Sequence, residues 1–176
     1  MAPEADVRHR AGTAVGILGI ALVTLSLGAG TPAPIPTAFR FDLTARPELH
    51  RLWKASFEAK AERVACLAAT IGGDTVEISG VSPLQPGRAD SLGISAEASL
   101  EDCGPPLWQG TVHTHVALRD GLHPYSFFSG ADRGVMMLWW RRWNVAGIFC
   151  LLYSGSEVIC EIEGPNGAVL FPRSQY

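Results

Sequence analysis

The chain has 176 residues, a formal net charge of −3 and no run of basic residues. Nucleic acid is therefore not an expected partner, because binding to phosphates requires a concentrated positive surface. The length suits one folded domain that is large enough to bury a core once any terminal segment is set aside.

Residues 1–38 differ in composition from the rest and are expected to be a hydrophobic anchor or signal peptide followed by a linker. No charged residue occurs from Ala11 to Phe39, and Arg8 and Arg10 precede this apolar run. A secretory signal peptide has this form. A single membrane-spanning helix needs about 20 apolar residues, and Ala11–Gly30 supplies them. The lack of a clear Ala-x-Ala cleavage site favours the uncleaved anchor, but both interpretations stay open.

The flanking charges indicate how such an anchor would be oriented. Arg8 and Arg10 favour a cytoplasmic N-terminus, and so an extracytoplasmic folded domain. If the segment is cleaved, the protein is secreted instead. The proline-rich stretch Thr31–Thr37 predicts an extended tether. We expect the folded domain to span residues 39–176.

The first part of this domain is expected to contain a helix and two strands. Thr44 is placed to cap a helix that opens at Pro47. Apolar residues then recur at helical spacing up to the glycine pair at 72–73, with a break near residues 58–61: Leu49, Leu52, Trp53, Phe57, Val64 and Leu67. The pattern then predicts a strand over Asp74–Ser79, a loop over Val81–Gly93 and a strand over Ile94–Ala98.

The second part is expected to contain four strands and one helix. The helix begins at Ser129, after an irregular loop over Arg119–Phe128, and its apolar residues follow the i, i+3, i+4, i+7 pattern: Met136, Trp139, Trp140 and Trp143. The expected strands, of which the middle two form a hairpin, are Gln109–Val116, Val145–Tyr153, Glu157–Glu163 and Ala168–Phe171. These elements predict an α+β (α/β-like) fold, with a mixed β-sheet flanked by helices.

Two histidines are spaced so that both can reach one metal ion. His113 and His115 are separated by one residue on a predicted strand, so their side chains point to the same side. Asp132, one loop later, can add a carboxylate. Three protein ligands with an open fourth position are typical of catalytic zinc. The sequence therefore predicts a Zn²⁺ site and a hydrolase.

Together with Glu62, these residues resemble the JAMM motif of MPN-domain zinc metalloproteases. That motif is a glutamate on the first helix, then His-x-His, then Ser-x-x-Asp; here Glu62 is followed by His113-Thr114-His115 and by Ser129-Gly130-Ala131-Asp132. The resemblance covers roughly residues 41–163 and implies an MPN/cytidine-deaminase-like architecture. Two features depart from the family pattern. The second histidine and the serine are fourteen residues apart, which is longer than usual, and Ala65-Cys66 stands where a glycine is often found.

The resemblance also implies a mechanism and a substrate class. His113, His115 and Asp132 would hold Zn²⁺, which lowers the pKa of a bound water to about 7. Glu62 would act as the general base, and Ser129 would donate a hydrogen bond to the developing oxyanion. The expected substrate is a peptide or isopeptide bond, classically at the tail of a ubiquitin-like protein.

Each part of the motif also has an ordinary structural explanation. Ser129 and Asp132 match a helix capping box, and Glu62 alone would be a surface acid. The alternative function is a non-catalytic, membrane-tethered MPN-like scaffold or protein-interaction module. Such domains usually lack one or more motif residues, whereas all are present here. His123 precedes a proline in the predicted loop and is left out of the metal site.

The four cysteines are Cys66, Cys103, Cys150 and Cys160, and their spacing matches no zinc knuckle. Cys150 and Cys160 fall opposite each other in the predicted hairpin, so an external domain could oxidise this pair. In the absence of a known compartment, we expect all four to be reduced, buried side chains.

Overall fold

The computed structural model describes residues 35–176 apart from 86–88, 91–92, 95 and 165–166. The predicted anchor or signal peptide lies outside the described residues, so it stays a prediction, as does most of the linker. Within the described part of the chain, no helix has the length and apolar character needed to cross a bilayer.

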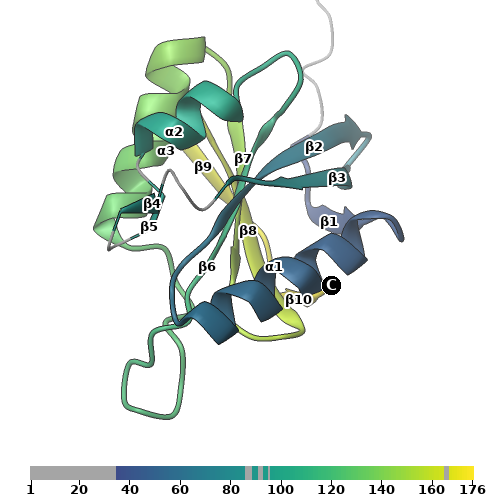
Figure 1. The fold of residues 1–176 in the computed structure, drawn as a ribbon. Helices are drawn as coiled ribbons and strands as arrows, with labels where there is room; N and C mark the ends of the chain where they lie inside the picture. Colours follow the sequence, from purple (N-terminus) through teal and green to yellow (C-terminus); the bar gives the residue numbers. More distant parts are fainter. Residues whose placement is uncertain (1–34, 86–88, 91–92, 95, 165–166) are drawn as a thin grey trace, which may run out of the picture. The chain divides into compact units, whose positions relative to one another are not determined.

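A mixed eight-stranded sheet forms the centre of the described part (Figure 1). Its strands are β1 (Ala38–Phe41), β2 (Val64–Gly72), β3 (Thr75–Pro83), β6 (Gly110–Thr114), β7 (Gly147–Leu152), β8 (Glu157–Gly164), β9 (Gly167–Leu170) and β10 (Ser174–Gln175). They follow the order β1-β3-β2-β6-β7-β8-β10, and β9 pairs with β8. Only the pairs β1–β3 and β6–β7 are parallel among these strands. A separate short ladder joins β4 (Ala89–Asp90) to β5 (Gly93–Ile94).

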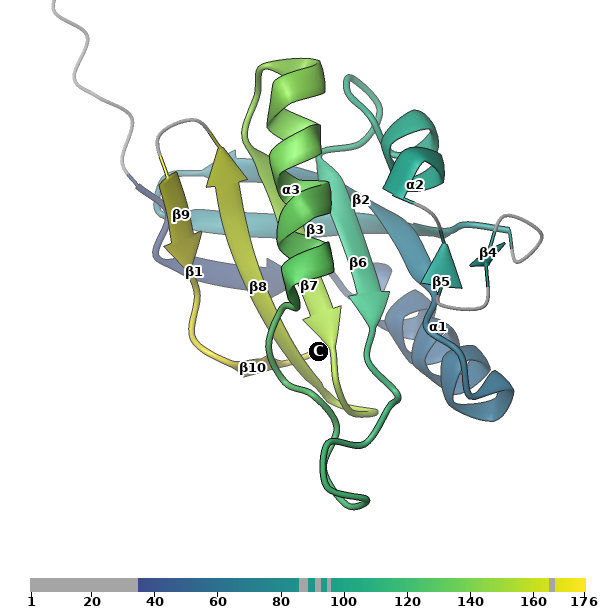
Figure 2. The same cartoon turned by 90° about the vertical axis from the view of Figure 1, so that its left-hand side faces the viewer.

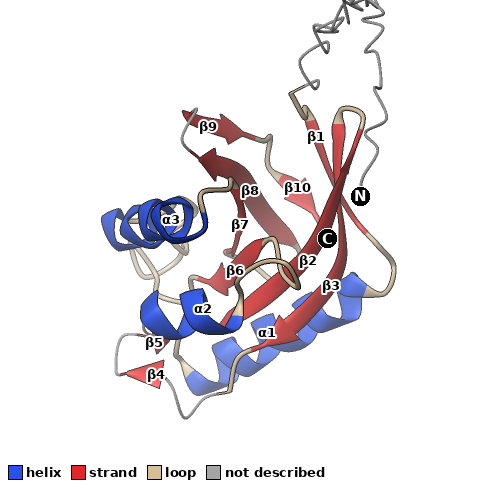
Figure 3. Cartoon of the chain, turned by 90° about the horizontal axis from the view of Figure 1, so that it is seen from above, coloured by secondary structure: helices blue, strands red, loops and turns tan. Residues whose placement is uncertain are grey.

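Helices cover both faces of the sheet, which curls like half of a barrel (Figure 3). Helix α1 (Ala45–Ala59) lies on one face, and α2 (Ala96–Asp102) and α3 (Gly130–Trp143) lie on the other (Figure 2). The alternation of side chains along the strands supplies one apolar cluster to each face. On the α1 side, Leu49 and Leu52 pack with Leu67 and Ile78, whereas Met136 and Trp139 on α3 pack in the other cluster. The predicted α+β fold with a mixed sheet and flanking helices is confirmed.

Helix α1 ends earlier than the apolar spacing predicts. Lys60 adopts the left-handed conformation at φ 51°, and its N–H donates to the carbonyls of the last helical turn. Val64 and Leu67 continue the helical spacing, but they lie on β2. This central strand is covered on both faces, so nearly all of its residues are apolar and the sequence does not show the alternation of apolar and polar residues that usually marks a strand. The prediction that Glu62 lies on a helix is therefore wrong, because Glu62 lies in the loop between α1 and β2.

The other predicted elements are confirmed, with three further corrections. The strand expected over Ile94–Ala98 is wrong, because α2 begins at Ala96, where an Ala-Glu-Ala sequence favours a helix. Strand β3 also runs to Pro83, into the expected loop. Thr44 does precede α1, but its hydroxyl donates to Asp42 and Ser79 instead of capping the helix.

All four cysteines form disulfides, so the expectation of reduced cysteines is wrong. Cys150 and Cys160 are direct neighbours across β7 and β8, as the hairpin spacing allows. The second disulfide joins Cys66 on β2 to Cys103, next to the end of α2. This pair is separated by 37 residues, and only the packing of α2 on the sheet brings the two Cα atoms to 4.9 Å.

The two disulfides are expected to differ in their contribution to stability. If cross-links act mainly on the unfolded chain, the separation of 37 residues contributes about 4 kcal/mol and the separation of 10 residues about 3 kcal/mol. The double substitution Cys66→Ala/Cys103→Ala should therefore lower the free energy of unfolding more than Cys150→Ala/Cys160→Ala does. Denaturant unfolding of both variants measures this, and the reverse order would contradict it.

Candidate metal centre

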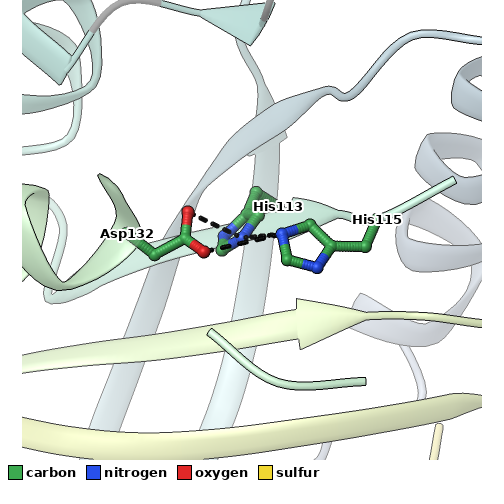
Figure 4. A group of neighbouring side chains, drawn as sticks. All are labelled: His113, His115 and Asp132. Atoms are coloured by element: carbon green, nitrogen blue, oxygen red, sulfur yellow. Dashed lines mark hydrogen bonds and ion pairs between the residues drawn. The ribbon is translucent and has the colours of Figure 1, made fainter. Parts of the chain in front are cut away.

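The structure brings together the three side chains that the sequence nominates as metal ligands. His113 and His115 lie at the end of β6, and Asp132 lies in the first turn of α3 with its carboxylate facing both imidazoles (Figure 4). The Nε2 atom of His113 is 3.2 Å from Asp132 Oδ1, and the Nε2 atom of His115 is 3.5 Å from Asp132 Oδ2. The two Nε2 atoms are 3.3 Å apart. All three potential ligand atoms lie within 4.8 Å of one another, so the cluster could hold a metal ion.

Strand pairing fixes the positions of the histidines. His113 lies opposite Val64 on β2 and Leu151 on β7, so its backbone is held from both sides. His115 follows the strand, and its N–H donates to the carbonyl of Leu152 at 2.9 Å. The histidine side chains point to the face covered by α3, where Phe128 packs against the ring of His113.

A backbone carbonyl sets the proton position on His115. The Nδ1 atom of this ring is 3.1 Å from the carbonyl oxygen of Tyr125. A carbonyl oxygen only accepts, so Nδ1 must donate, and in the neutral ring the lone pair is then on Nε2. In the neutral ring this lone pair faces Asp132, whereas in the protonated ring the same nitrogen donates a hydrogen bond to the carboxylate. Metal-ligating histidines commonly have this arrangement, with the second nitrogen bonded to a carbonyl or carboxylate.

Asp132 serves two roles at the start of α3. Its Oδ2 atom accepts from the backbone N–H of Ser129 at 2.5 Å, and the Ser129 hydroxyl accepts from the backbone N–H of Asp132 at 3.2 Å. This is the capping box that the sequence also allows. The same carboxylate faces the histidines, so capping and the proposed ligation do not exclude each other.

Glu62 lies beside the cluster although it is not on a helix. Its Oε1 atom is 3.8 Å from His115 Nε2. The two residues that flank it are held by a buried pair of hydroxyls: Ser56 and Thr114, whose oxygen atoms are 2.5 Å apart. Ser56 donates to the carbonyl of Ala61, and the Thr114 hydroxyl accepts from the N–H of Arg63 at 2.9 Å. These contacts fix the loop that places Glu62 at the site.

Burial and mutual attraction shift the pKa values of the cluster. Burial would raise the pKa of Asp132, but hydrogen bonds to His113 and His115 reverse this and hold it well below its usual range. Burial would lower the pKa of His115, but the hydrogen bond to Asp132 and the charge of Glu62 raise it. Burial raises the pKa of Glu62, against the attraction of both histidines.

A buried ion pair that the sequence analysis did not single out anchors the start of α3. Glu161 on β8 is fully buried and accepts a hydrogen bond from Arg133, the residue after Asp132. Arg133 also bonds to Glu163 at 3.1 Å and lies 5.3 Å from the ring centre of Phe128. Burial raises the pKa of Glu161, and Arg133 opposes this increase. An acid at a core-facing position of a predicted strand was the signal available in the sequence.

His123 is not part of the cluster, in agreement with the sequence analysis. It is exposed, and its Nδ1 atom lies 2.9 Å from Asp120 Oδ2. Hydrogen bonds from His123 hold the pKa of Asp120 well below its usual range. The site therefore comprises His113, His115 and Asp132, with Glu62 and Ser129 beside them.

Comparisons with known proteins do not assign the chain to a family. No family model matches the chain, and no curated protein matches it. Among solved structures, it is similar to the solution structure of protein DSY2949 from Desulfitobacterium hafniense, with 12% sequence identity and a TM-score of 0.47. The match covers 76% of this chain and 91% of that chain. A similarity at this level supports no inference about function.

The hydroxyl pair below Glu62 yields a stability prediction. Thr114→Val leaves the N–H of Arg63 without its acceptor in the interior and removes one of the two hydrogen bonds of the Ser56 hydroxyl, which keeps its bond to the carbonyl of Ala61. We expect the free energy of unfolding to fall by about 1–3 kcal/mol. Thr111→Val is the matched control, because Thr111 is buried on the same strand and makes no side-chain hydrogen bond to the described residues. Equal losses for the two variants in denaturant unfolding would contradict the prediction.

Proposed function

We propose that the protein is a zinc-dependent hydrolase of the JAMM/MPN class that cleaves a peptide or isopeptide bond. The observation that supports this proposal most is the convergence of His113, His115 and Asp132 from two elements separated by a loop. Glu62 lies beside them, with its Oε1 atom 3.8 Å from His115 Nε2. The order and identity of these residues match the motif, although Glu62 lies in the loop after α1 and not on the helix. The matching residue order is also the basis on which we propose an MPN-like architecture for the sheet and its helices.

The donor set fits zinc. Two imidazole nitrogens and one carboxylate oxygen are ligands that zinc takes in catalytic sites, where a fourth position is left for water or substrate. One histidine has its second nitrogen held by a carbonyl, as is usual for zinc ligands. The cluster is largely buried, with His113 13% and Asp132 17% exposed at the side chain. Glu62 is more exposed, at 36%, so the site is open on its side.

The residues divide the chemistry among them. A zinc ion at this cluster supplies Lewis acidity, which activates water at neutral pH and polarises a carbonyl group. The Glu62 carboxylate accepts the proton of the attacking water and then delivers it to the leaving amine. The Ser129 hydroxyl accepts a hydrogen bond from the Asp132 N–H, so its own proton is available to donate to the oxyanion.

The disulfides bear on where this hydrolase would act. Disulfides persist in oxidising compartments and are rare in the cytosol, and two are present here. We therefore propose an extracytoplasmic domain, either anchored by residues 11–30 or secreted after their removal. Its proposed partners are a peptide or a ubiquitin-like protein as substrate and, for the anchored form, the membrane.

The proposal predicts that metal binding and catalysis separate by mutation. Glu62→Gln keeps the size of the side chain but removes the base, so zinc should be retained while the cleavage rate falls by roughly 10²–10⁴. His113→Ala should lose both zinc and activity. A chelator should abolish the activity of the unmodified protein, and added zinc should restore it. The measurements are zinc content and cleavage of a peptide library.

Glu58→Gln is the matched control, because Glu58 is an exposed acid on α1 whose only recorded partner within the described residues is Lys54, at 3.9 Å. It should leave both zinc content and the cleavage rate unchanged. If Glu62→Gln cleaves like Glu58→Gln, the general-base role is wrong. If zinc is bound through His113 but no peptide is cleaved, the protein is a scaffold instead of an enzyme.

A further inference from the structure

The loop between β6 and α3 projects from the domain next to the candidate metal centre and is held in place by its own hydrogen bonds. It follows His115 and extends beyond the ends of β6 and β7 before the chain enters α3 (Figure 2). Leu118 and Pro124 form an antiparallel bridge, and the N–H of Arg119 donates to the carbonyl of His123 at 2.7 Å. The loop therefore closes on itself as a small hairpin. It also contains the residues that make the histidine–serine spacing longer than the motif usually has.

The base of this loop is held at two points, one at the site and one at the C-terminal segment. The carbonyl of Tyr125 accepts from His115. Ser126 accepts a hydrogen bond from Arg173 at 3.0 Å, and the guanidinium of Arg173 lies over the ring of Tyr153. A projection fixed in this way keeps a defined position relative to the histidines.

The loop presents apolar side chains to solvent. Four of them are exposed: Leu118 by 51%, Leu122 by 79%, Tyr125 by 37% and Phe127 by 50%. Tyr125 and Phe127 pack edge to face with ring centres 5.6 Å apart. Exposed apolar residues gathered at one place mark an interaction site more often than isolated ones do.

The charges of the loop are matched internally. Asp120 lies 2.9 Å from His123 and 4.0 Å from Arg119, so the one carboxylate of residues 116–128 is paired within the loop. This arrangement suits an apolar partner better than an acidic peptide or a charged lipid headgroup. A peptide bound at the metal centre would lie next to this loop, because the backbone carbonyl of Tyr125 is 3.1 Å from the His115 ring. An extended chain advances about 3.3 Å per residue, so residues close to the cleaved bond are the ones that the loop can contact.

We propose that the loop of residues 116–128 is a substrate-binding element that selects peptides with an apolar side chain near the cleaved bond. This inference rests on the proposed hydrolase function and adds a substrate preference to it. The contact forms equally with substrate and transition state. Its loss should therefore raise KM and leave kcat unchanged.

The test is a loop truncation in the full-length protein. Leu118 and Pro124 are already bridged, so a flexible Gly-Gly linker can replace Arg119–His123. The linker needs no turn hydrogen bond, which Pro124 could not donate because it lacks an N–H. Leu122→Ser is a second, milder variant, and Tyr125→Ser/Phe127→Ser removes the two exposed rings that the truncation keeps. Leu170→Ser, on the edge strand β9, is the control, because Leu170 is similarly exposed but lies on another element. Zinc content and the thermal midpoint are measured for each variant.

Cleavage is then measured on a peptide library that varies the residues on both sides of the cleaved bond. For apolar peptides, KM should rise about tenfold in the truncated protein and in the variant without the two rings, with kcat, zinc content and the cleavage of polar peptides unchanged. The same preference in truncated and unmodified protein would overturn the inference while leaving the hydrolase intact. The inference would also be overturned if the truncation abolished vesicle binding or self-association and left cleavage unchanged. If the unmodified protein binds zinc but cleaves no peptide, the proposed function fails, and this inference fails with it.

Discussion

The alternation of side chains at the end of β6 is the constraint on which the candidate site depends. Thr114 faces α1, where its hydroxyl holds the loop that places Glu62. Its neighbours His113 and His115 face the opposite side, toward Asp132. Three consecutive residues thus organise both halves of the site. Because the period of a strand is two, a shift of one residue in the pairing with β2 and β7 would exchange these roles and separate the glutamate from the histidines.

The start of α3 is the second fixed point of the site. In the capping box, the backbone N–H of Ser129 donates to the Asp132 carboxylate and so orients it. The pair between Arg133 and the buried Glu161 ties the same helical turn to β8. Burying a carboxylate costs free energy unless it is paired, so this ion pair is weak evidence of stability as such. Its position one residue after Asp132 indicates instead that it holds the aspartate in place.

The local sequence pattern predicted most of the elements. It also predicted that the two histidines and the aspartate meet, because the histidines of a His-x-His sequence on a strand point to the same face of the sheet. Features set by tertiary packing could not be predicted. Val64 and Leu67 continue the spacing of α1, and only the burial of β2 on both faces explains why they form a strand and leave Glu62 in a loop. The pairing of Cys66 with Cys103 likewise depends on where α2 packs. The hydrogen bonds by which Thr114 holds the Glu62 loop could not be predicted either, because they depend on which side chains meet in the interior.

The most direct test of the account is the position of the metal. Crystals of the protein grown with equimolar zinc would be measured at the zinc absorption edge. The account predicts one anomalous peak about 2.0–2.2 Å from Nε2 of His113, Nε2 of His115 and a carboxylate oxygen of Asp132, with Glu62 outside the ligand set. A peak held elsewhere, for example by Asp120 and His123, or no zinc at the cluster, would contradict it.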